Sequence, residues 1–183
     1  NGREYLTHVT ETLRHRITQL DDSIEAGQKE IEGMHEYYWE NYTEMDQYGY
    51  ENFDNQQALL HEINASNEKI ELRRRFRKMI DSPFFGRVDF CYEGDDEPEI
   101  FYIGIANLAE ENGGLPLIYD WRAPVSGLFY DFDKGPASYQ APLGEIHGDI
   151  AAKWQYKIRG GKMIYEFESD VKIDDEILKA ELG

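Results

Sequence analysis

Apolar residues in the first part of the chain recur at steps of three, four or seven positions, which is the spacing of one face of a long α-helix. The stripe is continuous except for one break at Gly27. So narrow a stripe does not stabilise an isolated helix, and this helix therefore needs a partner. Its positions are Leu6, Val9, Leu13, Ile17, Leu20, Ile24, Ile31, Met34 and Tyr38.

A second stripe follows, and it predicts that the partner helix belongs to the same chain. Gln56, Ser66 and Arg73 interrupt this stripe. Between the two stripes lies an acidic, tyrosine-rich segment in which Gly49 is the natural turn residue. The pattern predicts an antiparallel helical hairpin with its tip near residues 44–54. The apolar positions of the second stripe are Phe53, Leu59, Ile63, Ile70, Phe76 and Ile80.

After Pro83, which ends the second helix, the apolar period changes to 2, which is typical of β-strands. Gly160-Gly161 separates two alternating runs and predicts a tight hairpin turn. Acidic residues open a last segment, Asp174 to Leu182, for which a short helix is predicted. The predicted strands are Phe84–Tyr92, Glu99–Leu108, Leu115–Trp121, Leu128–Phe132, Ala137–Gln140, Ile150–Arg159 and Met163–Ser169.

Together these patterns predict an α+β protein in two parts. Residues 1–82 form an antiparallel coiled-coil arm, and residues 83–183 form a β-rich domain from which the arm projects. The sheet should be mostly antiparallel, either open or closed into a small barrel. A length of 183 residues accommodates one globular domain with such an appendage, or two small domains.

Composition narrows the classes of function. A net charge of -18 and a pI near 4.6 oppose binding of the whole chain to a nucleic-acid backbone, and favour a basic protein surface or one lined with metal ions. The single cysteine, Cys91, excludes an internal disulfide and is consistent with a cytoplasmic protein. No apolar stretch has the length that a membrane span requires. The sequence begins without a methionine and ends abruptly, so we expect a fragment.

Charge is segregated along the predicted arm. From Asp21 to Asp54 there are eleven carboxylates, and Lys29 is the one opposing cation. One interpretation is a solvated helix surface. The other is a surface that binds a basic partner, because aromatic residues crowd the same tip and aromatic residues are frequent at interface hot spots. The second helix ends in a basic cluster of Lys69, Arg73, Arg74, Arg75, Arg77 and Lys78.

Patterns for catalysis are incomplete. Gly160-Gly161-Lys162 lacks the upstream glycine and the following Ser or Thr of a phosphate loop. The five histidines are scattered and complete no metal site. The segment Asp120-Trp121-Arg122 is followed by Pro124 and allows two interpretations. Arg122 pairs with Asp120 while Trp121 packs at a corner of the core, or Arg122 presents its charge to a nucleotide or an adjoining domain.

Seven blocks of the second half carry a family resemblance. They are Phe85–Phe90, Tyr102–Ile105, Asp120–Pro124 with Phe129-Tyr130, Tyr139–Pro142, Gly144–Ile146, Lys153–Ile158 and Asp175–Leu178. Their order and spacing resemble the N-terminal region of the HelD family, bacterial superfamily 1 helicase-like ATPases that associate with RNA polymerase. The arm resembles that family in kind rather than by motif. Trp154 is a departure, because a basic residue is expected at its position.

The resemblance implies that the arm enters the secondary channel of RNA polymerase and that its acidic tip approaches the catalytic magnesium, helping to release nucleic acid. The β-rich domain would begin the first motor domain, with the phosphate loop after Gly183. ATP and Mg²⁺ would then belong to the full-length protein, and this fragment would bind no cofactor or metal of its own and would not be catalytic. Candidate tip residues are the carboxylates Glu44, Asp46, Glu51 and Asp54 and the aromatic anchors Tyr48, Tyr50 and Phe53.

Two alternatives belong to other classes of function. In the first alternative, the chain is the N-terminal fragment of a conventional ATP-dependent DNA helicase. Its last β-hairpin would then bind nucleic acid through Lys153, Lys157, Arg159 and Lys162. Alternatively, the helical hairpin is a dimerisation module in which two arms pair into a four-helix bundle. The net negative charge opposes the first of these alternatives.

Overall fold

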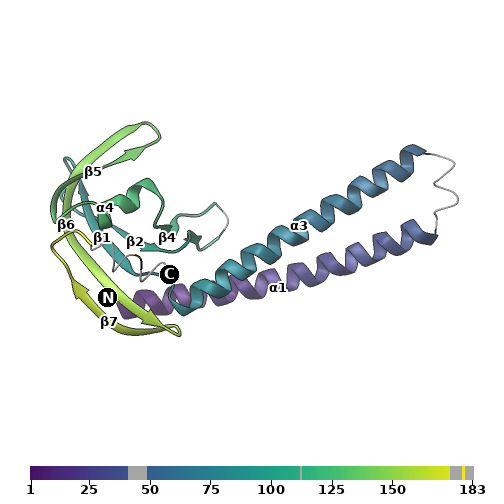
Figure 1. The fold of residues 1–183 in the computed structure, drawn as a ribbon, viewed down its shortest axis with the longest axis horizontal. Coiled ribbons are helices and arrows are strands. Elements are labelled where there is room, and N and C mark those ends of the chain that lie inside the picture. The colour runs from purple at the N-terminus through teal and green to yellow at the C-terminus, as the bar shows by residue number, and fades with distance from the viewer. Residues whose placement is uncertain (41–48, 112, 174–178, 180–183) are drawn as a thin grey trace. The chain divides into compact units, whose positions relative to one another are not determined.

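The structure is a computed structural model that describes residues 1–40, 49–111, 113–173 and 179; the side chains of residues 38–40 and 49–53 lie outside this description. It confirms an α+β protein, with two long helices and a seven-stranded mixed sheet (Figure 1). The chain divides into two compact units. One comprises Arg14–Arg77, and the other combines Asn1–Leu13 with Lys78–Gly183.

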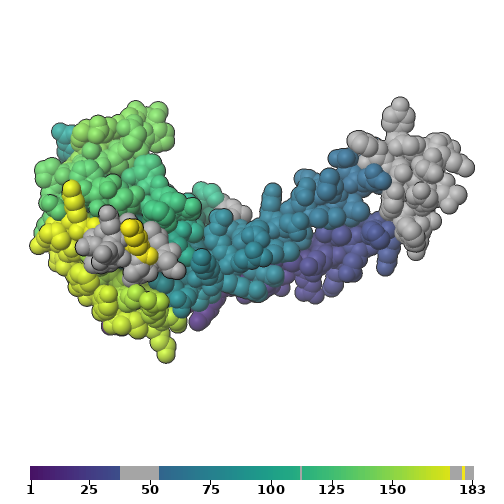
Figure 2. All heavy atoms as spheres, viewed as in Figure 1, coloured from purple at the N-terminus to yellow at the C-terminus, as the bar shows by residue number. Residues whose placement is uncertain are grey.

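The two helices are α1, Gly2–Glu40, and α3, Gly49–Asp81 (Figure 1). The side chain of Asn1 caps the N-terminus of α1. Its Oδ1 accepts hydrogen bonds from the backbone N–H groups of residues 3 and 4 at 2.8 and 3.1 Å. Between the helices, the guanidinium of Arg16 lies 5.1 Å from the ring centroid of Phe76, and Arg73 Nη1 lies 2.7 Å from Asp21 Oδ1. The later residue of α1, Asp21, contacts the earlier residue of α3, Arg73, so the two helices run in opposite directions. This confirms the antiparallel hairpin. Figure 2 shows the two helices of this hairpin with their side chains.

Part of the predicted contact between the helices is wrong for α3. Ser66 and Arg73, which interrupt the predicted stripe, are buried and half-buried, whereas Ile63 of the stripe is 37% exposed. A small hydroxyl and a salt-bridged arginine thus occupy interior positions of α3, and apolar side chains of this helix are displaced toward its surface. The stripe of α1 is confirmed more fully, since Leu13 and Ile24 are buried.

The sheet has the strand order β3-β4-β2-β1-β6-β5, with β7 pairing β6. The pair β2 with β4 is parallel, and the other pairs are antiparallel. The predicted hairpin turn is confirmed, with positive φ angles of 56° and 74° at Gly160 and Gly161. The strands are β1 Gly86–Tyr92, β2 Glu99–Gly104, β3 Leu108–Ala109, β4 Pro116–Asp120, β5 Gly135–Ala141, β6 Gly144–Arg159 and β7 Lys162–Glu168.

The predicted strand Leu128–Phe132 is wrong. The chain there forms a 3₁₀ turn, Pro124–Ser126, followed directly by the short helix α4, Gly127–Tyr130. Leu128 and Phe129 are both buried, and a short buried apolar run has no period that separates strand from helix. Pro124 at the first helical position was the signal for a helical turn. The predicted C-terminal helix lies outside the described residues apart from Lys179, which is helical.

Two cores hold the β-rich unit together. One contains Val88, Phe90 and Phe129, together with other buried residues of β1, β2, α4 and β6. The other joins the first turns of α1 to the sheet: the Tyr5 ring stacks on Tyr102 at 3.7 Å between ring centroids, and its hydroxyl donates to the Leu117 carbonyl at 2.6 Å. The first thirteen residues are therefore part of the β-rich unit.

The long strand β6 has two partners along one edge. Its residues 144–150 pair with β5 and its residues 154–159 pair with β7, while β1 occupies the other edge. Lys153 lies between the two pairings, where the strands diverge. Its backbone carbonyl accepts a hydrogen bond from Ser169 N–H at 2.8 Å.

Candidate functional site

The predicted tip of the arm lies mostly outside the described part of the chain. Glu44, Asp46 and Tyr48 fall in residues 41–48, and the side chains of Tyr50, Glu51 and Phe53 are likewise outside the description. The backbone of α3 begins at Gly49, so the last three of these lie on its first turns. Asp54 is described, and it is exposed. The sequence argument for an acidic, aromatic tip therefore stays a prediction.

The described part of the hairpin shows how its charges are used. Arg73 and Arg77 of the basic cluster both reach Asp21 across the helices, at 2.7 and 3.4 Å. Toward the tip, within residues 22–37 and 54–70, the one ion pair that the structure shows joins Lys29 to Glu25 at 3.7 Å. Two cations near the base are thus engaged with Asp21, whereas most acidic residues within residues 22–37 and 54–70 are exposed. The exposed ones are Asp22, Glu25, Glu30, Glu32, Glu36, Asp54 and Glu68.

Two hollows lie on the described part of the hairpin. The first, of about 290 Å³, is lined by Ile31, Glu32, His35 and Glu36 of α1 and by Leu59 and Ile63 of α3. The second, of about 360 Å³, is lined by Glu30, Gly33, Met34, Tyr37 and Asn55. Each hollow combines an apolar floor with at least one carboxylate. Sequence reasoning about the tip did not find them, because a stripe in α1 does not reveal which side chains of α3 face outward.

The segment Asp120-Trp121-Arg122 forms a scaffolded corner at the end of β4. The Asp120 carboxylate accepts hydrogen bonds from Arg122 Nε at 3.0 Å, from Nη2 at 2.7 Å and from its backbone N–H at 2.9 Å. The bond to Asp120 raises the pKa of Arg122. Ser126 Oγ donates to the Asp120 carbonyl, and Trp121 packs against the first core. The structural interpretation of this segment fits the geometry, while the exposed guanidinium leaves the interdomain role a prediction.

This corner supports a prediction about stability. Asp120→Ala removes an acceptor from the Arg122 backbone N–H in a half-buried turn, so it should lower the free energy of unfolding by about 1 to 2 kcal/mol. Arg122→Ala removes an exposed side chain and should leave the thermal midpoint unchanged. Differential scanning calorimetry of both variants checks this. Equal destabilisation by the two would show that the ion pair, rather than the backbone bond, stabilises the corner.

Some of the basic residues predicted to bind nucleic acid are exposed to solvent, and one of them is buried. Lys153 is fully buried, and its Nζ donates to the carbonyls of Phe132 at 2.5 Å and Val171 at 3.1 Å. Burial lowers the pKa of this amine to about 8, and the Asp133 carboxylate offsets part of that effect. The structure therefore contradicts a role for Lys153 in contacting a phosphate backbone. Arg159 and Lys162 are exposed.

The backbone N–H groups of the Gly160-Gly161 turn donate hydrogen bonds to another part of the protein. Gly160 N–H donates to Asp81 Oδ1 at 2.7 Å, and Gly161 N–H donates to the Asp81 carbonyl at 2.9 Å. Because a phosphate loop needs such N–H groups for its ligand, this turn does not fit a nucleotide phosphate. The turn instead joins the end of α3 to the β6–β7 hairpin.

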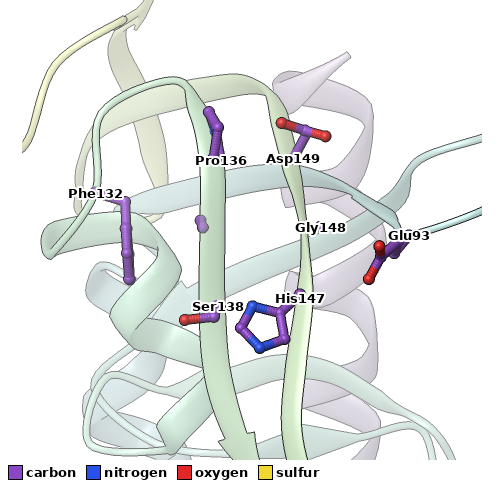
Figure 3. Close-up of a pocket in the computed structure, with 8 residues that line it drawn as sticks. Glu93, Phe132, Pro136, Ser138, His147, Gly148 and Asp149 are labelled. Carbon is purple, nitrogen blue, oxygen red and sulfur yellow. The ribbon is translucent and has the colours of Figure 1, made fainter.

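A polar hollow of about 500 Å³ opens beside β5 and β6 (Figure 3). Ser138 and His147 lie opposite each other on these strands, with Asp149, Glu93 and Phe132 around them (Figure 3). Among the described residues, no group of three or more His, Cys, Asp or Glu side chains is placed to hold a metal ion. Among the same residues, no helix is long and apolar enough to cross a membrane.

A family model described as "DNA helicase IV HelD, N-terminal domain" matches residues 1–181. No curated protein matches the sequence. The match extends through the helical hairpin as well as the β-rich region, whereas the motif resemblance in the sequence was confined to residues after Phe84.

Proposed function

The chain belongs to the family of HelD N-terminal domains, and from this premise we propose that it is the polymerase-binding part of a HelD-like helicase. In this proposal the acidic tip of the arm enters the secondary channel of RNA polymerase, helps to release nucleic acid, and so recycles the enzyme in the cytoplasm. ATP and Mg²⁺ are bound by motor segments of the full-length protein.

One observation supports this proposal most directly. Most of the described carboxylates toward the tip are exposed, whereas Arg73 and Arg77 near the base are paired with Asp21. The distal arm thus carries a net negative field that its own cations do not neutralise. Such a field steers the arm toward a basic channel, and carboxylate oxygens are ligands that Mg²⁺ accepts.

The proposal is tested by measuring the affinity of residues 1–183 for core RNA polymerase with a fluorescent label. A variant with Glu44, Asp46, Glu51 and Asp54 changed to serine should bind at least about tenfold more weakly, and its affinity should depend less on salt. The matched control changes four exposed acids of the β1–β2 turn to serine, with the same loss of charge. These are Glu93, Asp95, Asp96 and Glu97.

Unchanged affinity of the tip variant would contradict the role of the tip. Equal weakening by both variants would show that net charge alone draws the chain to the polymerase. Two alternatives are tested by the same protein: affinity for duplex or single-stranded DNA at moderate salt would favour a DNA-binding β domain, and a dimer in sedimentation equilibrium would favour pairing of arms.

A further inference from the structure

The two hollows of the hairpin lie on opposite flanks of α1. At 100° per residue, Ile31, Glu32, His35 and Glu36 centre on one side of the helix axis. Glu30, Gly33, Met34 and Tyr37 centre about 180° away. The stripe that faces α3 runs between these two groups. A partner that surrounds the arm would therefore meet both hollows, while a flat partner would meet one.

The first hollow has an apolar floor contributed by both helices. Ile31 comes from α1, and Leu59 and Ile63 come from α3. Ile63 is 37% exposed, and Leu60, one turn away, is 49% exposed. A single exposed apolar side chain needs no explanation, but Ile63 also lines a hollow of about 290 Å³ together with Ile31 and Leu59. The hollow has room for one aliphatic side chain of a partner.

The rim of this hollow is acidic and regularly spaced. Glu32 and Glu36 are both exposed and lie four residues apart on α1, so they are neighbours on one helix face. Lysine or arginine side chains one turn apart on a partner helix have the same spacing. Apolar floor and acidic rim together match the helix-in-groove mode of recognition, with basic residues beside an apolar anchor.

We infer that the arm binds through its flank as well as its tip: the hollow formed by Ile31, Leu59 and Ile63 takes an apolar side chain from a basic amphipathic helix of the polymerase, and Glu32 and Glu36 pair with the cations of that helix. This inference rests on the proposed function, since it assigns a second contact to the same arm.

The test measures affinity of residues 1–183 for core RNA polymerase with two flank variants. Ile63→Ser removes one of the three apolar side chains of the floor. The pair Glu32→Gln with Glu36→Gln removes the rim charges and keeps good helix formers at both positions. Each should weaken binding about tenfold, as central interface residues do. The glutamine pair should also flatten the salt dependence, whereas Ile63→Ser should leave it unchanged. Controls are Leu115→Ser and Leu143→Ser, which are exposed apolar residues of the β-rich unit.

The outcomes separate this inference from the proposed function. If the tip variant loses affinity while both flank variants bind like the controls, the flank inference is overturned and the proposed function stands. If wild type shows no affinity for the polymerase, both are overturned. Circular dichroism verifies that Ile63→Ser keeps its helix content; should it unfold, the glutamine pair decides alone, because two exposed substitutions by a good helix former preserve α1.

Discussion

Lys153→Ala is expected to lower the free energy of unfolding by about 4 kcal/mol at about pH 9.5, where the amine is largely neutral in the folded protein. The substitution removes three fully buried methylenes, each worth about 0.8 kcal/mol, and two hydrogen bonds worth about 1 kcal/mol each. The carbonyls of Phe132 and Val171 then lose a donor in the interior. Chemical denaturation of both proteins measures the difference.

The cost of this substitution should shrink as the pH falls. In the folded state the pKa of Lys153 is lowered to about 8 from 10.5, so the folded protein binds fewer protons than the unfolded chain between these values. The free energy of unfolding of the wild type therefore rises with pH across this window, by up to about 3 kcal/mol from this one group. At pH 7 the buried amine is charged in the folded state, and its desolvation lowers the stability by the full amount. Lys153→Ala lacks this rise.

One control variant and one limit on the pH range make the experiment specific. Lys162→Ala removes an exposed lysine of β7 and should not change the shape of the pH profile. Measurements stop near pH 10, because burial raises the pKa of Tyr102, and deprotonation of tyrosine in the unfolded chain lowers stability above that pH. An alanine variant whose destabilisation is the same at pH 7 and pH 9.5 would contradict a buried, weakly basic Lys153.

Gly104→Ala is the second substitution with a large expected effect, a loss of about 3 kcal/mol or more in the free energy of unfolding. A Cβ at this position would overlap the backbone carbonyl of Pro83 and would lie 3.0 Å from Ile118 Cγ2. The carbonyl belongs to the link between α3 and β1 and cannot swing aside as a flexible side chain would. Gly104 also accepts the Trp121 N–H at 2.9 Å, so a shift of β2 would disturb the corner at Arg122.

Gly127→Ala is the matched control in the same unit. Its Cβ would meet only the end of the flexible Asp131 side chain, at 3.2 Å, and the backbone there is already right-handed helical with φ -57°. This variant should be as stable as wild type or slightly more so, because alanine favours helix over glycine. Thermal unfolding followed by near-UV circular dichroism compares the two. Similar midpoints for both variants would refute the close approach at Gly104.

The sequence allowed the helical hairpin to be predicted because α1 repeats one apolar face over many turns. A single polar or small residue in so long a pattern does not change the prediction. It did not allow the orientation of α3 about its own axis to be predicted in full, because Ser66 and Arg73 were taken as interruptions, whereas Ser66 is buried and Arg73 pairs with Asp21 of α1. The pairing of Arg73 with Asp21 is a contact across fifty-two positions, and no local pattern contains it. For the same reason Ile63 was not expected at the surface.

The burial of Lys153 could not be predicted from the sequence, for a different physical reason. A lysine in an alternating strand reads as a solvent-facing charge, since lysine is seldom buried. Its environment depends on where β5 and β7 leave the edge of β6, and that fork is set by long-range register. The Asp120–Arg122 pair, by contrast, joins near neighbours through a proline-directed turn, and such local chemistry was visible beforehand.

The assignment of residues 1–13 to the β-rich unit has a consequence for biosynthesis. Tyr5 is translated long before Tyr102 and well before the β6–β7 hairpin that completes the same core. At roughly 5 to 20 residues per second, the first turns of α1 wait on the order of ten seconds for these partners to leave the ribosome. The hairpin of residues 14–77 needs nothing from later in the chain, so we expect a nascent chain to complete its arm first and to close its sheet last.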